Sequence, residues 1–170
     1  KIIKSEIKEI ISSSIVIWTT TPWTIPGNRA LAYSDDLEYI LIELEELNDS
    51  SIAKVNDKVV IAKKLLENVT NEVGITKFKI IKTFLGKEFK GTECEHPLKD
   101  IGYDFTIKAL SADFVTTDQG SGIVHVAPGH GDDDYNLGIK NDIDIVQTVN
   151  DDGKYNENAI GFVGEHVFKV

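Results

Sequence analysis

Short apolar, β-prone runs recur along the whole of this 170-residue chain, and they constrain its fold more than any other feature. Runs rich in Val, Ile, Tyr and Phe favour strands, especially where Gly, Pro, Asn or Asp residues bound them. Helices are expected only at 63–73, which Gly74 would end, and at 132–140. The expected strands are 15–20, 29–33, 39–44, 59–62, 78–84, 105–110, 114–116, 123–126 and 143–149, with another short one between Gly86 and Gly91.

This order of elements predicts a mainly β fold, with a closed or nearly closed β-barrel core and a few peripheral α-helices. Strands do not alternate regularly with helices, which disfavours a doubly wound parallel sheet. The length suits one domain covering residues 1–170. Because the chain starts with Lys1 and contains no methionine, we expect it to be excised from a larger protein.

Charge and cysteine content exclude several classes of function. The formal net charge is -10, and Arg29 is the only arginine, so a broad phosphate-gripping surface is not expected. The single cysteine, Cys94, excludes an intramolecular disulfide and a cysteine-rich zinc site, and it fits a cytoplasmic location. No run of 18 apolar residues is present, so no transmembrane helix is expected.

Three consecutive threonines, Thr19, Thr20 and Thr21, end the first apolar run directly before Pro22. Strand alternation would place Thr19 and Thr21 on one face, but a break at Pro22 lets two or three hydroxyls reach one cavity. A hydroxyl both donates and accepts hydrogen bonds, so it can hold a carbonyl, a ribose hydroxyl or a water without adding charge. Threonine is also simply a good strand residue, and the tripeptide alone favours that structural interpretation.

A second candidate segment joins the 123–126 strand, which carries His125, to the helix that begins with three aspartates. His125, His130 and an aspartate could bind a metal, although their spacing is not the one that puts two histidines on one helical face. Ser121, His125 and an aspartate could form a nucleophilic triad, but no nucleophile-elbow sequence surrounds Ser121.

Two further interpretations of the same segment remain. An aspartate could hold a substrate ammonium group while His125 shapes the cavity. Alternatively, His125 is a satisfied core histidine and the aspartates cap the helix, which the residues alone favour.

Two stretches resemble the editing domain of bacterial-type isoleucyl-tRNA synthetases, in the class I family: Trp-Thr-Thr-Thr-Pro-Trp-Thr-Ile-Pro-Gly-Asn at 18–28, and 122–135. Valyl and leucyl relatives have Thr-Thr-Arg-Pro and an acid where this chain has Thr-Pro-Trp. Residues 150–155 and 161–164 resemble the end of the same domain. The resemblance covers nearly the whole chain and is weakest at about 45–95.

The resemblance implies hydrolytic proofreading of misacylated tRNA within an isoleucine–tRNA ligase whose ligase active site lies outside this segment. The substrate would be valyl-tRNA(Ile), with valyl-adenylate as an option. It implies catalytic roles for Thr20, Thr21 and Asp134, with Asp134 also anchoring the amino group. His125 would limit the size of the pocket. The implied substrate-binding residues are Thr19, Trp23, Asn28, Gly122, His125 and Asp134.

The same resemblance sets the expected cofactors and partners. No metal or cofactor is expected in this domain, whereas the full-length enzyme would use ATP and could also contain zinc. The expected partners are the 3′ end of tRNA(Ile) carrying valine and the rest of the synthetase in cis, with no membrane. The isolated domain is expected to be a monomer. Two rivals are a free-standing hydrolase acting in trans and a degenerate module that only tethers tRNA.

Overall fold

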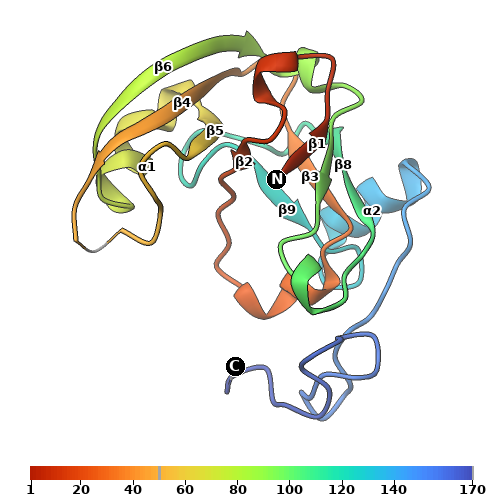
Figure 1. Cartoon of the computed structure of the whole chain (residues 1–170). Helices are drawn as coiled ribbons and strands as arrows, with labels where there is room; N and C mark the ends of the chain where they lie inside the picture. The colour runs from red at the N-terminus through yellow and green to blue at the C-terminus, as the bar shows by residue number, and fades with distance from the viewer. Residues whose placement is uncertain (50, 170) are drawn as a thin grey trace.

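Two mixed β-sheets form the framework of the molecule (Figure 1). The computed structural model describes residues 1–49 and 51–169. One sheet has five strands in the order β1-β7-β8-β3-β9, and the other has four in the order β2-β5-β4-β6. The strands are β1 (Ile2–Lys4), β2 (Ser14–Ile15), β3 (Ala30–Tyr33), β4 (Glu38–Leu47), β5 (Lys58–Ala62), β6 (Ile75–Leu85), β7 (Glu93–Glu95), β8 (Thr106–Ser111) and β9 (Val124–Val126).

Helices are few and short. The α-helices are α1 (Leu66–Glu72) and α2 (Asp132–Lys140), and the second has the bounds expected from the sequence. The 3-10 helices are η1 (Lys8–Ile10), η2 (Pro22–Gly27), η3 (Lys63–Leu65), η4 (Gly86–Phe89) and η5 (Lys99–Ile101). No helix within 1–49 and 51–169 combines the length and the apolar character that crossing a bilayer requires.

The mainly β composition is confirmed, but the expected closed or nearly closed β-barrel is wrong. Within the described residues, the first and last strands of each sheet do not pair, so each sheet stays open. Each sheet also contains one parallel pair, β3 with β8 and β2 with β5, and parallel neighbours need a crossover rather than a hairpin. The runs 114–116 and 143–149, which were expected to add strands, form none.

Other differences from the expected elements have local causes. The run 15–20 is a strand only as far as Ile15, and beyond it Trp18 makes a single isolated bridge with Val124. The segment after Gly86 is the 3-10 helix η4 instead of a strand, because the Glu88 carboxylate accepts the Leu85 N–H and turns the chain. Residues 22–27, where no helix was expected, form η2.

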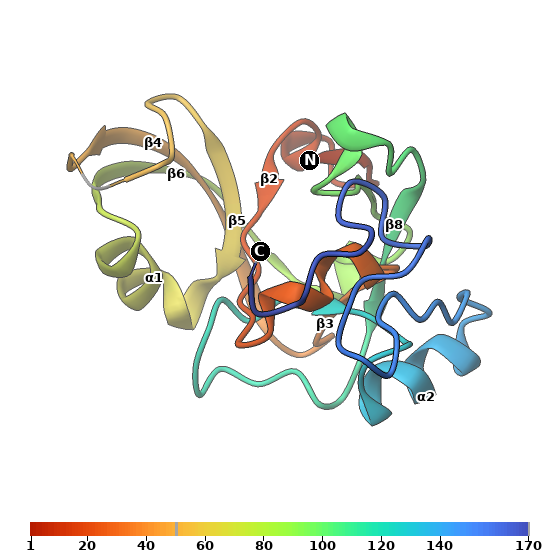
Figure 2. The ribbon, with the colours of Figure 1, turned by 90° about the horizontal axis from the view of Figure 1, so that it is seen from below.

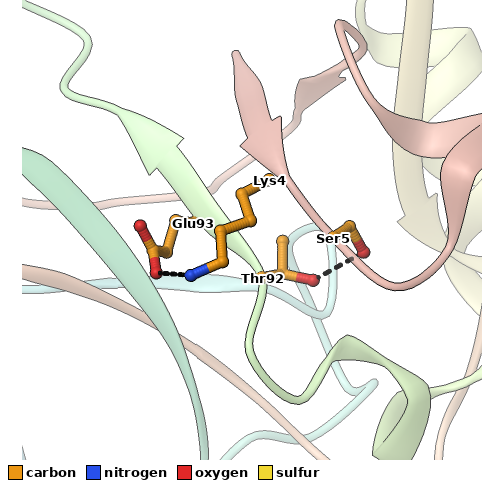
Figure 3. A network of polar contacts seen from close by, with 4 residues as sticks. All are labelled: Lys4, Ser5, Thr92 and Glu93. Carbon is orange, nitrogen blue, oxygen red and sulfur yellow. Dashed lines mark hydrogen bonds and ion pairs between the residues drawn. The ribbon is translucent and has the colours of Figure 1, made fainter.

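Strands β1 and β7, which the sequence did not predict, pair with each other (Figure 3). The Lys4 ammonium lies 2.6 Å from a Glu93 carboxylate oxygen, and the Ser5 and Thr92 hydroxyls lie 2.9 Å apart. These contacts join the start of the chain to the five-stranded sheet.

One hydrophobic core joins the two sheets. Strands β4 and β6 form a long curved ladder with α1 beside it, away from the five-stranded sheet (Figure 2). Fully buried Leu41 and Ile61 of this sheet belong to the same apolar cluster as Ile107 of the other sheet. Each buried aliphatic side chain of this kind contributes about 1.5–3 kcal/mol of burial free energy.

Tyr39 connects this core to the loop before β9. Its ring packs edge-on against Phe89 at 5.0 Å between centroids. Its hydroxyl accepts the Ser34 N–H at 3.1 Å and donates to the Gly122 carbonyl at 2.9 Å. Burial raises the pKa of Tyr39 to about 12, so the hydroxyl stays protonated and keeps donating. The position of Gly122 is therefore fixed from within the core.

Candidate functional site

A cavity of about 330 Å³ lies between the threonine segment, the loop before β9 and the first turn of α2. Its lining combines hydroxyls, backbone, two histidines and one carboxylate. The lining residues are Trp18, Thr19, Thr20, Thr21, Thr24, Phe114, Thr116, Gln119, Gly120, Ser121, Gly122, Ile123, Val124, His125, Ala127, His130 and Asp134. The structure thus gathers in one place six residues that the sequence predicted as site residues: Thr19, Thr20, Thr21, Gly122, His125 and Asp134.

The three threonines all reach the cavity because the strand ends before them. The Thr21 N–H donates to the Thr19 hydroxyl at 3.0 Å, and the two hydroxyls lie 3.4 Å apart, as expected for residues that share a face. Thr20 also lines the cavity, so the alternation of a regular strand is relaxed at this point. Thr20 and Thr21 are exposed, which leaves their hydroxyls accessible to a ligand.

Two glycines with left-handed backbone allow the loop before β9 to pack tightly against its neighbours. At Gly120, with φ of 78°, an added Cβ would lie 2.9 Å from Cβ of Trp18. At Gly122, with φ of 74°, an added Cβ would lie 2.3 Å from Cβ of Ala62. A side chain at either position would push the loop outward, since real Cβ atoms do not approach so closely. Gly122 therefore shapes the cavity through its backbone.

His125 is a neutral residue with a defined tautomer. Its side chain is buried, and its Nε2 atom lies 2.9 Å from the Thr24 hydroxyl. That hydroxyl donates its one hydrogen to the Thr21 carbonyl at 2.8 Å, so Nε2 must carry the hydrogen of its bond with Thr24. Burial, with a smaller effect of His130, lowers the pKa of His125 to about 4. A histidine with so low a pKa is a weak base, and it forms a fixed part of the wall.

Asp134 is the only formally charged group in this lining. Its Oδ2 atom accepts the Ala127 N–H at 2.8 Å, which orients the carboxylate at the start of α2. Burial raises the pKa of the Asp134 carboxyl, a nearby Asp133 adds to the effect, and the Ala127 hydrogen bond opposes it. The lining contains no lysine or arginine. The cavity is thus suited to a ligand with a cationic group, because a half-buried carboxylate favours a charge-assisted partner.

Two predicted site residues do not line the cavity. Trp23 lies behind the wall, with its ring edge-on to His130 at 5.5 Å, and its carbonyl accepts the Tyr155 hydroxyl at 2.9 Å. Asn28 is buried, and its Oδ1 atom has no hydrogen-bond partner among the residues that the structure describes. The structure therefore places both residues beside the site instead of at its surface, and their substrate-binding roles stay predictions.

The metal and triad hypotheses find no arrangement that supports them. Across the described positions, no three His, Cys, Asp or Glu side chains are grouped so that they could hold a metal ion. The Ser121 hydroxyl is buried and donates to the Ile123 carbonyl at 3.1 Å, while Nε2 of His125 is bonded to Thr24. Ser121 is therefore not activated as a nucleophile.

Several lining residues were missed by sequence reasoning. Trp18 and Thr24 flank the threonines, and their closeness in sequence was the available signal. Phe114, Thr116 and Gln119 come from a segment expected to be partly a strand, and nothing in their sequence pointed to a site.

Solved structures of other proteins share the fold of this chain. The editing domain of the cytosolic leucyl-tRNA synthetase of P. knowlesi superposes with a TM-score of 0.60 at 13% identity, over 75% of this chain and 51% of that one. The corresponding P. falciparum domain gives 0.54 at 18% identity, over 73% and 46%. The chain has the fold of a synthetase editing domain.

Curated relatives identify the particular family. The chain is 51% identical to the isoleucine–tRNA ligase of Pelagibacter ubique over 98% of its length, and 44% identical to that of Gluconobacter oxydans over 92%. The Vibrio vulnificus enzyme is 42% identical over 92%. No protein-family model matches the chain. By sequence, the chain belongs to the isoleucine–tRNA ligases as one segment of them, which confirms the resemblance; it spans 18%, 16% and 15% of these relatives.

Proposed function

We propose that this chain is the editing domain of an isoleucyl-tRNA synthetase and hydrolyses the ester of valyl-tRNA(Ile). The observation that carries the proposal is the cavity in which the hydroxyls of Thr19, Thr20 and Thr21 meet the carboxylate of Asp134. An aminoacyl ester presents a cationic ammonium group next to a polar carbonyl. The carboxylate and the hydroxyls match these two features.

The chemistry would rest on positioning. Water attacks the ester carbonyl carbon, the bond from that carbon to the ribose oxygen breaks, and the ribose oxygen takes up a proton. Asp134 fixes the ammonium end, while Thr20 and Thr21 orient the water or the carbonyl. The neutral His125 is too weak a base to drive the attack, so a hydroxyl of the substrate's own ribose assists the reaction.

Selectivity would come from the size of the cavity. A hydrophobic pocket separates two ligands that differ by one methylene by only about 1–3 kcal/mol, a limit for which isoleucyl-tRNA synthetase is the standard example. A second site that admits valine and excludes isoleucine adds the missing accuracy. His125 can form the limiting wall, because its ring is held by Thr24 and backed by buried residues.

The wider context belongs to the same proposal. The rest of the synthetase would be part of the same polypeptide and would bind ATP, and it could also bind zinc. The enzyme would act in the cytoplasm. The domain itself would need no metal, and in isolation it would be a monomer. Valyl-adenylate is a second candidate substrate, because it presents the same ammonium and carbonyl groups.

The test is a deacylation assay with valyl-tRNA(Ile) and isoleucyl-tRNA(Ile) side by side. We expect the wild-type chain to release valine and to spare isoleucine. The double variant Thr20→Val with Thr21→Val keeps the side-chain shape and should lose the activity. A matched control, Thr76→Val with Thr83→Val, removes two exposed hydroxyls from β6 and should keep it. Equal release of both amino acids, or none from valyl-tRNA(Ile), would contradict the proposal.

A further inference from the structure

Four lysines line a second hollow, of about 610 Å³, at the far end of α2 from the cavity. It lies between η4, strands β7 and β8, and the residues that end α2. We call it the lysine hollow, and its charged lining residues are Lys87, Lys90, Lys108, Lys140, Asp35 and Glu93. Such a gathering is unexpected in a chain with a formal net charge of -10.

The four ammonium groups have no carboxylate partner in the described part of the chain. Ion pairs within 4 Å engage six other lysines, at positions 4, 63, 77, 82, 99 and 154, and none of these four. Glu93 lies opposite Lys108 in the β7–β8 register, yet its carboxylate is bound to Lys4 from outside the hollow (Figure 3). Against Asp35 and Glu93, the four lysines leave the lining of the hollow with a formal charge of +2.

We infer that the lysine hollow binds phosphate groups of the RNA strand whose 3′ end enters the threonine cavity. This inference rests on the proposed function, because that function supplies the RNA. Lysine ammonium groups contact phosphates as point charges, and the release of bound counterions makes such contacts favourable. Here they would add a local phosphate contact to a domain that otherwise repels nucleic acid.

The position of the hollow suits a strand that leaves the cavity. Asp134 lines the cavity and Lys140 lines the hollow, and both lie on α2. The two residues are six positions apart, which corresponds to about 9 Å along the helix axis. Stacked nucleotides advance by about 3.4 Å each, so the lysines would meet the first few phosphates behind the terminal nucleotide. The groove between the two sites shares Phe114 with the cavity and Lys140 with the hollow. Its other charged lining residues are Asp35, Asp113 and Asp133, so a strand that crosses it meets cationic groups only at the lysines of the hollow.

The experiment measures binding of fluorescently labelled, unacylated tRNA(Ile) to the chain between 50 and 200 mM salt. Each contact with a single-strand phosphate weakens binding by about 2.6-fold over this range, and four contacts weaken it by about 50-fold. We expect the wild-type chain to show this salt dependence. The salt dependence of tRNA binding should be lost when the four lysines of the hollow are replaced by glutamine: Lys87→Gln, Lys90→Gln, Lys108→Gln and Lys140→Gln.

Two further variants control for charge and for folding. The first makes the same change in charge at exposed lysines on the side of the four-stranded sheet, and it should bind like the wild type: Lys54→Gln, Lys58→Gln, Lys64→Gln and Lys79→Gln. Among the residues that the structure describes, these four lysines also form no ion pair. The second replaces the four lysines of the hollow by arginine, and it should retain the salt dependence. If the quadruple glutamine variant fails to fold, the single Lys108→Gln variant should still lower the slope of log K against log salt by about 0.7.

The outcomes separate this inference from the proposed function. The inference would be overturned if tRNA binding weakened equally in the hollow and control variants, or changed in neither. It would also be overturned if the wild-type chain did not bind tRNA. Poly-glutamate is added as a competitor at the same concentration of charge as the tRNA. If it displaces the tRNA from the hollow, the hollow binds an acidic protein segment instead. Because these assays use unacylated tRNA, a failure of ester hydrolysis leaves their result intact and counts only against the proposed function.

Discussion

Replacing Asp134 by asparagine tests the proposed ammonium contact most directly. The variant keeps the size of the side chain, and its amide oxygen can still accept the Ala127 N–H that now binds Oδ2. It removes the only formal charge in the cavity lining. A hydrogen bond to a charged group contributes about 1.5–3 kcal/mol. We therefore expect kcat/KM for valyl-tRNA(Ile) to fall by about 12- to 140-fold, at about 1.4 kcal/mol per factor of ten.

The matched control is Asp133→Asn, which removes the neighbouring charge from the same helical turn. Asp133 is exposed and does not line the cavity, so kcat/KM should stay within about twofold of the wild-type value. Both variants lose one favourable interaction with the α2 dipole, about 0.3–1 kcal/mol, which a urea melt at pH 7 would register equally. The reasoning is refuted if Asp134→Asn keeps full activity, or if the two variants lose activity to the same extent.

Three other results are expected. His125→Ala should open the wall of the cavity and let the chain deacylate isoleucyl-tRNA(Ile), and the absence of any gain in that assay would remove the size-limiting role. Tyr39→Phe leaves the Gly122 carbonyl without its donor, which costs about 1–3 kcal/mol and should lower Tm by at least about 2 °C in calorimetry. Burial lowers the pKa of both His96 and His125 from 6.5 to about 4, so the unfolded state binds protons first. The unfolding free energy should therefore fall as the pH drops from 6.5 to 4, by about 2–3 kcal/mol per histidine, and His96→Gln should flatten that slope in guanidinium titrations.

The sequence predicted elements best where local and tertiary preferences agree. Strands β3, β4, β5, β6, β8 and β9 were all expected near their observed positions, and α2 was expected with its exact bounds. The run 143–149 is as β-prone as any of these, yet only Val149 makes a bridge, with Tyr155. Strand propensity reports how well a residue fits a sheet, but it does not report whether an edge is available for pairing. For that reason the closure of a barrel could not be judged from the sequence.

In the candidate site too, local sequence patterns predicted some features, and tertiary packing decided the others. Thr19 to Thr21 and His125 lie at the ends of apolar runs, and Asp134 lies in the first turn of a helix, so sequence patterns placed all of them where a cavity can form. The hydrogen bond between Thr24 and His125 links residues 101 positions apart, so no local sequence pattern could predict it. Both tryptophans of the sequence signature were available, yet Trp23 faces His130 and Trp18 lines the cavity. Only the packing of the folded chain decides which of the two indoles reaches the cavity.

The threonines and Asp134, on the two walls of the cavity, are far apart in the sequence and are therefore synthesised at different times. The threonines leave the ribosome first, and Asp134 follows roughly 110 residues later. At about 5–20 residues per second, the first wall waits roughly 6–22 seconds for the second. Throughout that interval the nascent segment lacks the only carboxylate of the cavity lining. Any partner that retards elongation over this stretch would delay the appearance of editing without altering the finished domain.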